Sequence, residues 1–175
     1  MYFNIMKQYK LTLCMIVKNE ESIIEKTIKN IINNIPIDYW VISDTGSSDN
    51  TINIIQNTFN EHNIQGEFIN KNWVDFSTNR NYVIEHAEQK SEYLLYFDAD
   101  DSIEGNIILP NLKDDSYLFQ LKNKQITYNR IFITSTKFKW RYKCILHEFI
   151  TCLNKNNPNS TLISGNYYIY PNKLK

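Results

Sequence analysis

Apolar segments that alternate with amphipathic ones through the first hundred residues constrain the fold most strongly. Residues 9–17 and 93–97 are apolar at both odd and even positions, as strands are when they are buried on both faces. Residues 39–43 and 67–70 are shorter segments of the same strand-like kind. Four such strands predict a parallel sheet that is covered by helices on both sides.

Three amphipathic segments lie between these strands and predict the connecting helices. The first helix is expected to begin after a cap at Asn19 and to end before Pro36. The second is expected to be capped by Ser47 or Ser48, and the third covers residues 76–90. This alternating order is typical of right-handed βαβ units, so we predict an α/β fold with a mostly parallel sheet.

The pattern changes after about residue 105, where the chain becomes β-rich. Three shorter strands are predicted, at residues 117–121, 126–133 and 138–145. Neither an internal repeat nor a linker divides the sequence. We therefore expect a single domain over residues 1–175, with an α/β half at 9–105 and a smaller β-rich half at 106–175.

Charge and cysteine usage narrow the classes of partner. The 175 residues carry 19 basic and 19 acidic side chains, whereas nucleic-acid and membrane-surface proteins usually show a basic excess, so neither partner is expected. We also expect no transmembrane segment, because every apolar run is too short. Three cysteines without CxxC spacing predict reduced thiols and a cytoplasmic location, which is the host cytoplasm for a viral chain.

The sharpest motif is Asp98-Ala99-Asp100-Asp101, directly after the apolar run YLLYF. Ligands of open α/β sheets bind beyond the carboxyl ends of the strands. In an extended backbone Asp98 and Asp100 point to the same side, where a cation would relieve their repulsion. Hard oxygen donors suit Mg²⁺ or Mn²⁺. The alternative is a solvated strand end with a helix starting at Asp101 or Ser102.

A phosphate group could not be held by a glycine-rich loop in this chain. The four glycines are scattered singly, at Gly46, Gly66, Gly105 and Gly165, so neither GxGxxG nor a Walker loop can be built. Arginine binds phosphate better than lysine does, because its planar guanidinium donates several hydrogen bonds at once. Only three of the basic residues are arginine, namely Arg80, Arg130 and Arg141. Arg80, near the start of the third helix, is the first candidate, and a salt bridge on the helix surface is the alternative.

The second strand also ends in a carboxylate, Asp44, which is followed by TGSSD. Gly46 permits a tight turn, and the serines can cap the next helix. This structural role is a sufficient explanation of the motif. A carboxylate at a strand end can in addition accept a hydrogen bond from a nucleobase.

Four motifs together resemble a known family. They are LCMIVKNEE (13–21), VISDTGSSDNT (41–51), FSTNRNYVIEHA (76–87) and YLLYFDADD (93–101). Their order and spacing closely resemble family 2 glycosyltransferases of the GT-A fold, with a weaker likeness in NRIFI, FKW and ILHEFI farther along. The resemblance implies an enzyme that transfers a sugar from a nucleotide sugar, usually a UDP-sugar, to an acceptor hydroxyl.

The resemblance also implies how the donor is bound. Asp44 would contact the nucleobase, Val17 and Glu20 would line the same pocket, and Arg80 would grip the nucleotide. Asp98 and the rest of its motif match the DxD motif of the family.

The same motif implies a metal cofactor, Mn²⁺ or Mg²⁺, at the donor diphosphate. Asp98 would lie near the ribose or the metal, and Asp100 would ligate the metal. His147 is either a third metal ligand or diphosphate contact, or a hydrogen-bonded structural residue.

Family 2 enzymes generally invert the anomeric configuration, which requires a carboxylate base for the acceptor hydroxyl. Glu148 is the preferred candidate and Asp101 the other. Arg130, Trp140 and Arg141 are expected to form the acceptor side, although burial in the core explains Trp140 equally well. The acceptor itself is an unknown glycan, protein or lipid-linked group.

Two other functions remain as alternatives. A nucleotidyltransferase would need a glycine-rich loop after the first strand, where the chain has MIVKN. A non-catalytic module that binds sugar nucleotides agrees with the early end at Lys175, since the acceptor segment of the family normally extends well past His147 and Glu148.

Overall fold

The computed structural model describes residues 9–124, 126–144 and 148–171. Three helices are present in this part, α1 (Ile24–Asn34), α2 (Thr51–Glu61) and α3 (Phe76–Ala87). The strands are β1 (Tyr9–Val17), β2 (Tyr39–Asp44), β3 (Gln65–Asn70), β4 (Ser91–Tyr96), β5 (Asp101–Ile108), β6 (Ser116–Asn123), β7 (Ile126–Ser135), β8 (Trp140–Lys143), β9 (Phe149–Cys152), β10 (Ser160–Leu162) and β11 (Ser164–Pro171).

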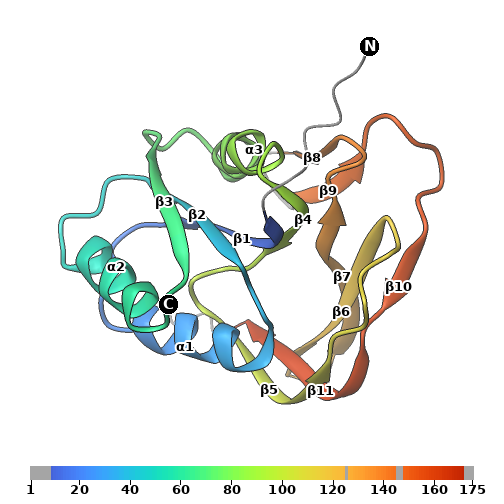
Figure 1. Ribbon diagram of the computed structural model, residues 1–175, viewed down its shortest axis with the longest axis horizontal. Coiled ribbons are helices and arrows are strands. Elements are labelled where there is room, and N and C mark those ends of the chain that lie inside the picture. The colour runs from blue at the N-terminus through green and yellow to red at the C-terminus, as the bar shows by residue number, and fades with distance from the viewer. Residues whose placement is uncertain (1–8, 125, 145–147, 172–175) are drawn as a thin grey trace.

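One large sheet runs through the molecule in the order β3-β2-β1-β4-β7-β6-β11-β5, with β10 paired to β6 (Figure 1). The first four strands are parallel to one another, as their apolar patterns predict. Beyond β4 the strands β7, β6 and β5 join through antiparallel pairs, while β11 and β10 lie parallel to β6. The predicted α/β fold with a mostly parallel sheet is confirmed.

The two faces of the sheet are covered by different elements (Figure 1). The isoleucines of α1 and residues of α2 pack with β1 and with the β5–β11 region in the larger core. On the other face α3 packs with the hairpin of β8 and β9, where Val83, Ile84 and Trp140 are buried. Because each helix of a βαβ unit returns across the sheet, the loops that follow β1, β2 and β4 meet at one edge.

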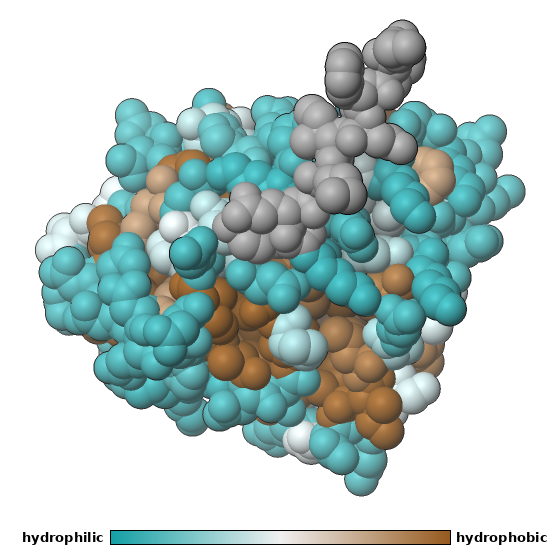
Figure 2. Space-filling model, in the orientation of Figure 1, coloured by the Kyte–Doolittle hydropathy of each residue, from teal (hydrophilic) through white to brown (hydrophobic). Residues whose placement is uncertain are grey.

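Hydrophilic residues cover most of the molecular face in Figure 2, while hydrophobic ones gather in its lower middle part. None of the helices between residues 9 and 171, as far as the structure describes them, is long and apolar enough to cross a membrane. Cys14, Cys144 and Cys152 are all free thiols, Cys14 buried and Cys144 exposed.

The first two helices begin later than the local capping pattern predicts. Helix α1 begins at Ile24, because Asn19 adopts a left-handed backbone (φ 54°) and the Glu20 carbonyl accepts the N–H groups of Ile23 and Ile24 in a turn. Helix α2 begins at Thr51, beyond both serines. The polar residues that were expected to cap these helices instead bond to each other across the two loops.

The acidic motif leads into a strand, so the alternative of a helix starting at Asp101 or Ser102 is wrong. Asp101 is the first residue of β5, which pairs antiparallel with β11 from Pro171 back to Ser164. β5 lies at the far edge of the sheet, although it follows β4 directly in the chain. The division expected after residue 105 falls inside this strand, and the division itself stays a prediction.

Candidate active site

The carboxyl ends of β1, β2 and β4 meet at one edge of the sheet. Val17 and Asp44 are partners in the parallel register, and Asp98 follows the end of β4. The carbonyl of Val17 accepts both the N–H and the hydroxyl of Thr45, at 3.0 Å each. The side chain of Val17 is buried in the larger core, so its backbone is what borders the edge.

The loops after β1 and β2 are joined by hydrogen bonds between side chains of one and backbone of the other. The N–H of Asn19 donates to the Ser47 hydroxyl at 2.9 Å, and the Asn19 side chain accepts the N–H of Ser48 at 2.8 Å. The N–H of Glu20 donates to the Thr51 hydroxyl at 2.7 Å. The sequence did not lead us to predict these hydrogen bonds between the two loops, although the clustered Asn, Ser, Asp and Thr residues in both motifs were a signal for them.

Asp44 is buried, and its carboxylate closes the turn of its own loop. It accepts the N–H of Gly46 at 3.0 Å, the N–H of Ser47 at 3.0 Å and the Ser47 hydroxyl at 2.5 Å. Gly46 has a φ of 108°, a backbone conformation that residues other than glycine rarely adopt. These contacts bear out the tight turn at Gly46 but not the helix cap expected of the serines, and the nucleobase contact of Asp44 stays a prediction.

Two arginines converge on the acidic motif. Arg80 of α3 places Nη2 2.7 Å from Oδ1 of Asp98 and 3.5 Å from Oε1 of Glu148. Arg130 of β7 places Nη2 3.6 Å from Oδ2 of Asp98 and 3.3 Å from Oδ2 of Asp101. Five of the residues chosen from the sequence thus form one charged network, which joins α3, β7, the start of β5 and the residue before β9.

The network shifts the pKa values of Asp98 and Asp101 in opposite directions. Burial raises the pKa of Asp98, but the charges of Arg80 and Arg130 outweigh it and hold that pKa below its usual range. Burial, followed by the negative charge of Asp98, raises the pKa of Asp101 to about 8. The arginines therefore favour the ionised form of Asp98, whereas burial favours the protonated form of Asp101.

Arg80 lies in a pocket of aromatic rings and not on the helix surface, so the surface-bridge alternative is wrong. Its side chain is 12% exposed, and the guanidinium carbon is 5.1 Å from the Tyr142 ring centre and 5.9 Å from that of Phe76. Burial lowers the pKa of Arg80, but Asp98 and other neighbours raise it well above its usual value. Its buried Nε has no hydrogen-bond partner within the described chain.

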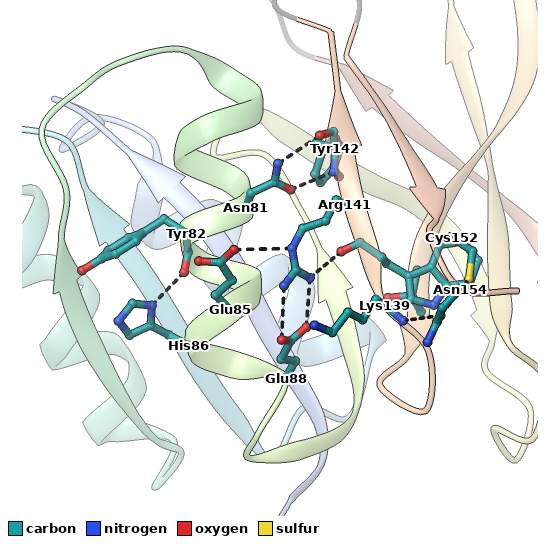
Figure 3. A network of polar contacts seen from close by, with 12 residues as sticks. Asn81, Tyr82, Glu85, His86, Glu88, Lys139, Arg141, Tyr142, Cys152 and Asn154 are labelled. Carbon is teal, nitrogen blue, oxygen red and sulfur yellow. Dashed lines mark hydrogen bonds and ion pairs between the residues drawn. The ribbon is translucent and has the colours of Figure 1, made fainter.

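The hairpin of β8 and β9 is fastened to α3 by polar contacts (Figure 3). The Asn81 side chain accepts the N–H of Tyr142 at 2.8 Å and donates to its carbonyl at 2.9 Å. Arg141 grips Glu88 with two nitrogens, at 2.9 and 3.2 Å. These contacts fix the Tyr142 ring beside Arg80 and hold the hairpin near Glu148.

The residues expected on the acceptor side divide into two groups. Trp140 is 2% exposed and its indole N–H donates to the Ser135 carbonyl at 3.1 Å, while Arg141 points to α3. Both side chains therefore pack the hairpin, and their acceptor role stays a prediction. Arg130 is 41% exposed and faces the acidic motif.

The acidic motif is chemically suited to a divalent cation that is shared with a ligand. Asp98 and Asp100 offer hard oxygen donors; two arginines contact Asp98, and Asp100 is half-buried. Within residues 9–124, 126–144 and 148–171, no three Asp, Glu, His or Cys side chains are grouped closely enough to hold a metal ion. His147 lies outside the described residues. The residues therefore fit a metal whose remaining ligands are water and phosphate.

The fold and this edge define an α/β protein of the GT-A type. The family model of glycosyl transferase family 2 matches residues 12–115, more than half of the chain. The chain therefore belongs to glycosyl transferase family 2, which confirms the resemblance of its motifs. A comparison with curated proteins gives no match.

Solved structures of TarS share the fold. TarS 1-349 of S. aureus in complex with UDP is 19% identical, with a TM-score of 0.50 over 65% of this chain and 36% of that one. The same protein in complex with UDP-GlcNAc is 20% identical, with a TM-score of 0.50 over 65% of this chain and 34% of that one. The mannosyltransferase PcManGT of Pyrobaculum calidifontis, in complex with GDP-Man and Mn²⁺, is 20% identical, with a TM-score of 0.47 over 55% of this chain and 29% of that one. The chain thus spans about a third of the length of these proteins.

Proposed function

We propose that this chain transfers a sugar from a nucleoside-diphosphate sugar to an acceptor hydroxyl. The observation that carries the proposal is the contact of Arg80 with Asp98 at the carboxyl edge of the sheet, inside the segment that matches the family. Carboxylates can bind the metal, and a buried guanidinium beside them can bind the negatively charged diphosphate.

The nucleotide is proposed to lie between the joined loops and Arg80. Glu20 lies in the loop after β1 and Asp44 at the end of β2, and Arg80 approaches from α3. The UDP and UDP-GlcNAc complexes of TarS, which has a similar fold, support UDP as the nucleotide. The sugar itself is left open by this argument.

We propose Mn²⁺ or Mg²⁺ as cofactor, held by Asp100 with Asp98 beside it. A divalent cation supplies positive charge that stabilises the departing nucleoside diphosphate. Arg80 orients Asp98 and offers further donors to a phosphate oxygen. Arg130, bonded to Asp101, adds a second positive charge on the acceptor-facing side of the motif.

Inversion requires one carboxylate that can take the proton of the acceptor hydroxyl. We propose Glu148 for this role. A base must be ionised before it accepts a proton, and burial raises the pKa of Asp101, which disfavours its ionised form. The side chain of Glu148 is 21% exposed, so solvent and an acceptor can reach it.

The acceptor is proposed to be a glycan, a protein or a lipid-linked group, and the free thiols support a reducing compartment such as the cytoplasm. A non-catalytic module that binds sugar nucleotides is the competing function. The two differ in turnover, because only an enzyme releases free nucleoside diphosphate.

The test is the release of UDP from UDP-sugars with Mn²⁺ or Mg²⁺, with water or candidate glycans as acceptor. We expect release by the wild type and a loss of at least about a hundredfold in Glu148→Gln, the usual size of a general-base contribution. Glu104→Gln, an exposed acid on β5, serves as the control and should retain activity. Binding of UDP without any release would favour the non-catalytic module.

A further inference from the structure

An exposed aromatic pair lies at the entrance to helix α3. Trp73 is 45% exposed and Phe76 46%, and their rings meet edge to face with centres 4.8 Å apart. Val74 between them is 58% exposed. The other two tryptophans, Trp40 and Trp140, are buried, so Trp73 is the one tryptophan that solvent reaches.

The backbone around Trp73 is held in place from below. The buried side chain of Asn79 accepts the N–H of Val74 at 2.9 Å and donates to the carbonyl of Asn72 at 3.2 Å. Asp75 caps α3 by accepting the N–H of Thr78 at 2.7 Å. Rings that are exposed while their backbone is fixed form a ready-made contact surface, because little further order is lost on binding.

This pair is continuous with the proposed donor site. Phe76 and Arg80 are one helical turn apart on α3, and the guanidinium carbon of Arg80 lies 5.9 Å from the Phe76 ring centre. The other end of the same guanidinium contacts Asp98 at 2.7 Å. The aromatic pair and the acidic motif therefore flank one arginine, as the base and the diphosphate of a nucleotide would.

The loops on the opposite side provide no flat surface for a base. Residues 18–23 and 45–50 contain no aromatic side chain. The oxygens of Asp44 already accept three hydrogen bonds from Gly46 and Ser47, which leaves little further capacity for a base. Hydrogen bonding at Asp44 alone would leave both faces of the base without a partner.

We propose that Trp73 and Phe76 form the stacking platform for the nucleobase of the donor. The inference rests on the proposed function, since it names the part of the nucleotide that these rings bind. An aromatic ring stacks on the π face of any base, so the platform contributes affinity more than selectivity between bases.

The fluorescence of Trp73 tests this without any substitution, because acrylamide quenches an exposed tryptophan much more than buried ones. With Mn²⁺ present, UDP and uridine should both protect Trp73 from quenching. Inorganic pyrophosphate, which has no base, should leave it quenchable. If pyrophosphate without a base protects Trp73, or if protection depends only on protein concentration, the rings bind another partner. Either result would overturn the proposal.

Binding of UDP to variants, measured by calorimetry, completes the test. Trp73→Leu and Phe76→Leu should each weaken binding about tenfold, within the usual range for loss of base stacking. Leu162→Ala on β10, 40% exposed and remote in the sheet, should bind as the wild type does. Unchanged UDP affinity in both ring variants would refute the platform and spare the proposed function, whereas a wild type that binds neither UDP nor GDP would refute both.

Discussion

Asp98 and Asp100 stand two residues apart, yet their replacement by asparagine should affect stability to very different extents. Asp98 neutralises Arg80, whose side chain is 12% exposed and whose Nη2 is 2.7 Å away. In Asp98→Asn the guanidinium keeps only the more distant Glu148, at 3.5 Å. Removing one member of a largely buried ion pair leaves an uncompensated charge, which for this partly solvated pair costs about 2 kcal/mol.

For a chain of this length a loss of that size lowers the melting temperature by about 4–8 °C. The charge of Asp100, in contrast, raises the pKa of Asp101 and thus opposes negative charge in the cluster. Asp100→Asn removes this repulsion, so it should lower the melting temperature less than Asp98→Asn does. Differential scanning calorimetry without ligand measures both. An Asp98→Asn variant as stable as the wild type would refute the electrostatic argument, and a badly unfolded Asp100→Asn would make the cluster structural.

Two further predictions concern charged contacts outside the acidic motif. Glu88→Gln removes a largely buried charge that two nitrogens of Arg141 contact, so it should cost about 1–2 kcal/mol of stability. Thermal unfolding should then show a melting temperature lower by about 3–6 °C. An unchanged melting temperature would mean that this ion pair contributes nothing to stability. Burial raises the pKa of Asp115, but hydrogen bonds from Lys155 and from the Asn159 N–H outweigh it and lower that pKa. The contribution of Asp115 to stability is therefore complete above about pH 4 and lost as the pH falls through its folded pKa. The difference in melting temperature between wild type and Asp115→Asn should be full at pH 6 and shrink as the pH falls below about 4. A difference that stays constant with pH would contradict this.

The parallel half of the sheet could be predicted because its strands are buried on both faces. β1 and β4 carry this property in their own residues, so no distant contact was needed to recognise them. The starts of α1 and α2 could not be predicted in the same way. Asn19 and Ser47 look like helix caps locally, but they bond to each other across 28 positions of the chain.

The candidate site shows the same division. The positions of Asp98 and Arg80 follow from the order of strands and helices, so the sequence placed them at one edge of the sheet. The pairing of Arg130 with Asp101 depends on β7 lying beside β4, an antiparallel contact that no local pattern encodes. A tryptophan such as Trp140 can either stack on a sugar or pack in the core, and only its 2% exposure shows that it packs in the core.

The central claim is that the edge formed by β1, β2 and β4 binds the diphosphate of a nucleotide sugar. A crystal structure of the chain with a UDP-sugar and Mn²⁺ tests it most directly. We expect the metal at Asp100, the diphosphate between it and Arg80, and the base toward Trp73. A nucleotide bound elsewhere, or a saturating soak that leaves this edge empty, would contradict the account.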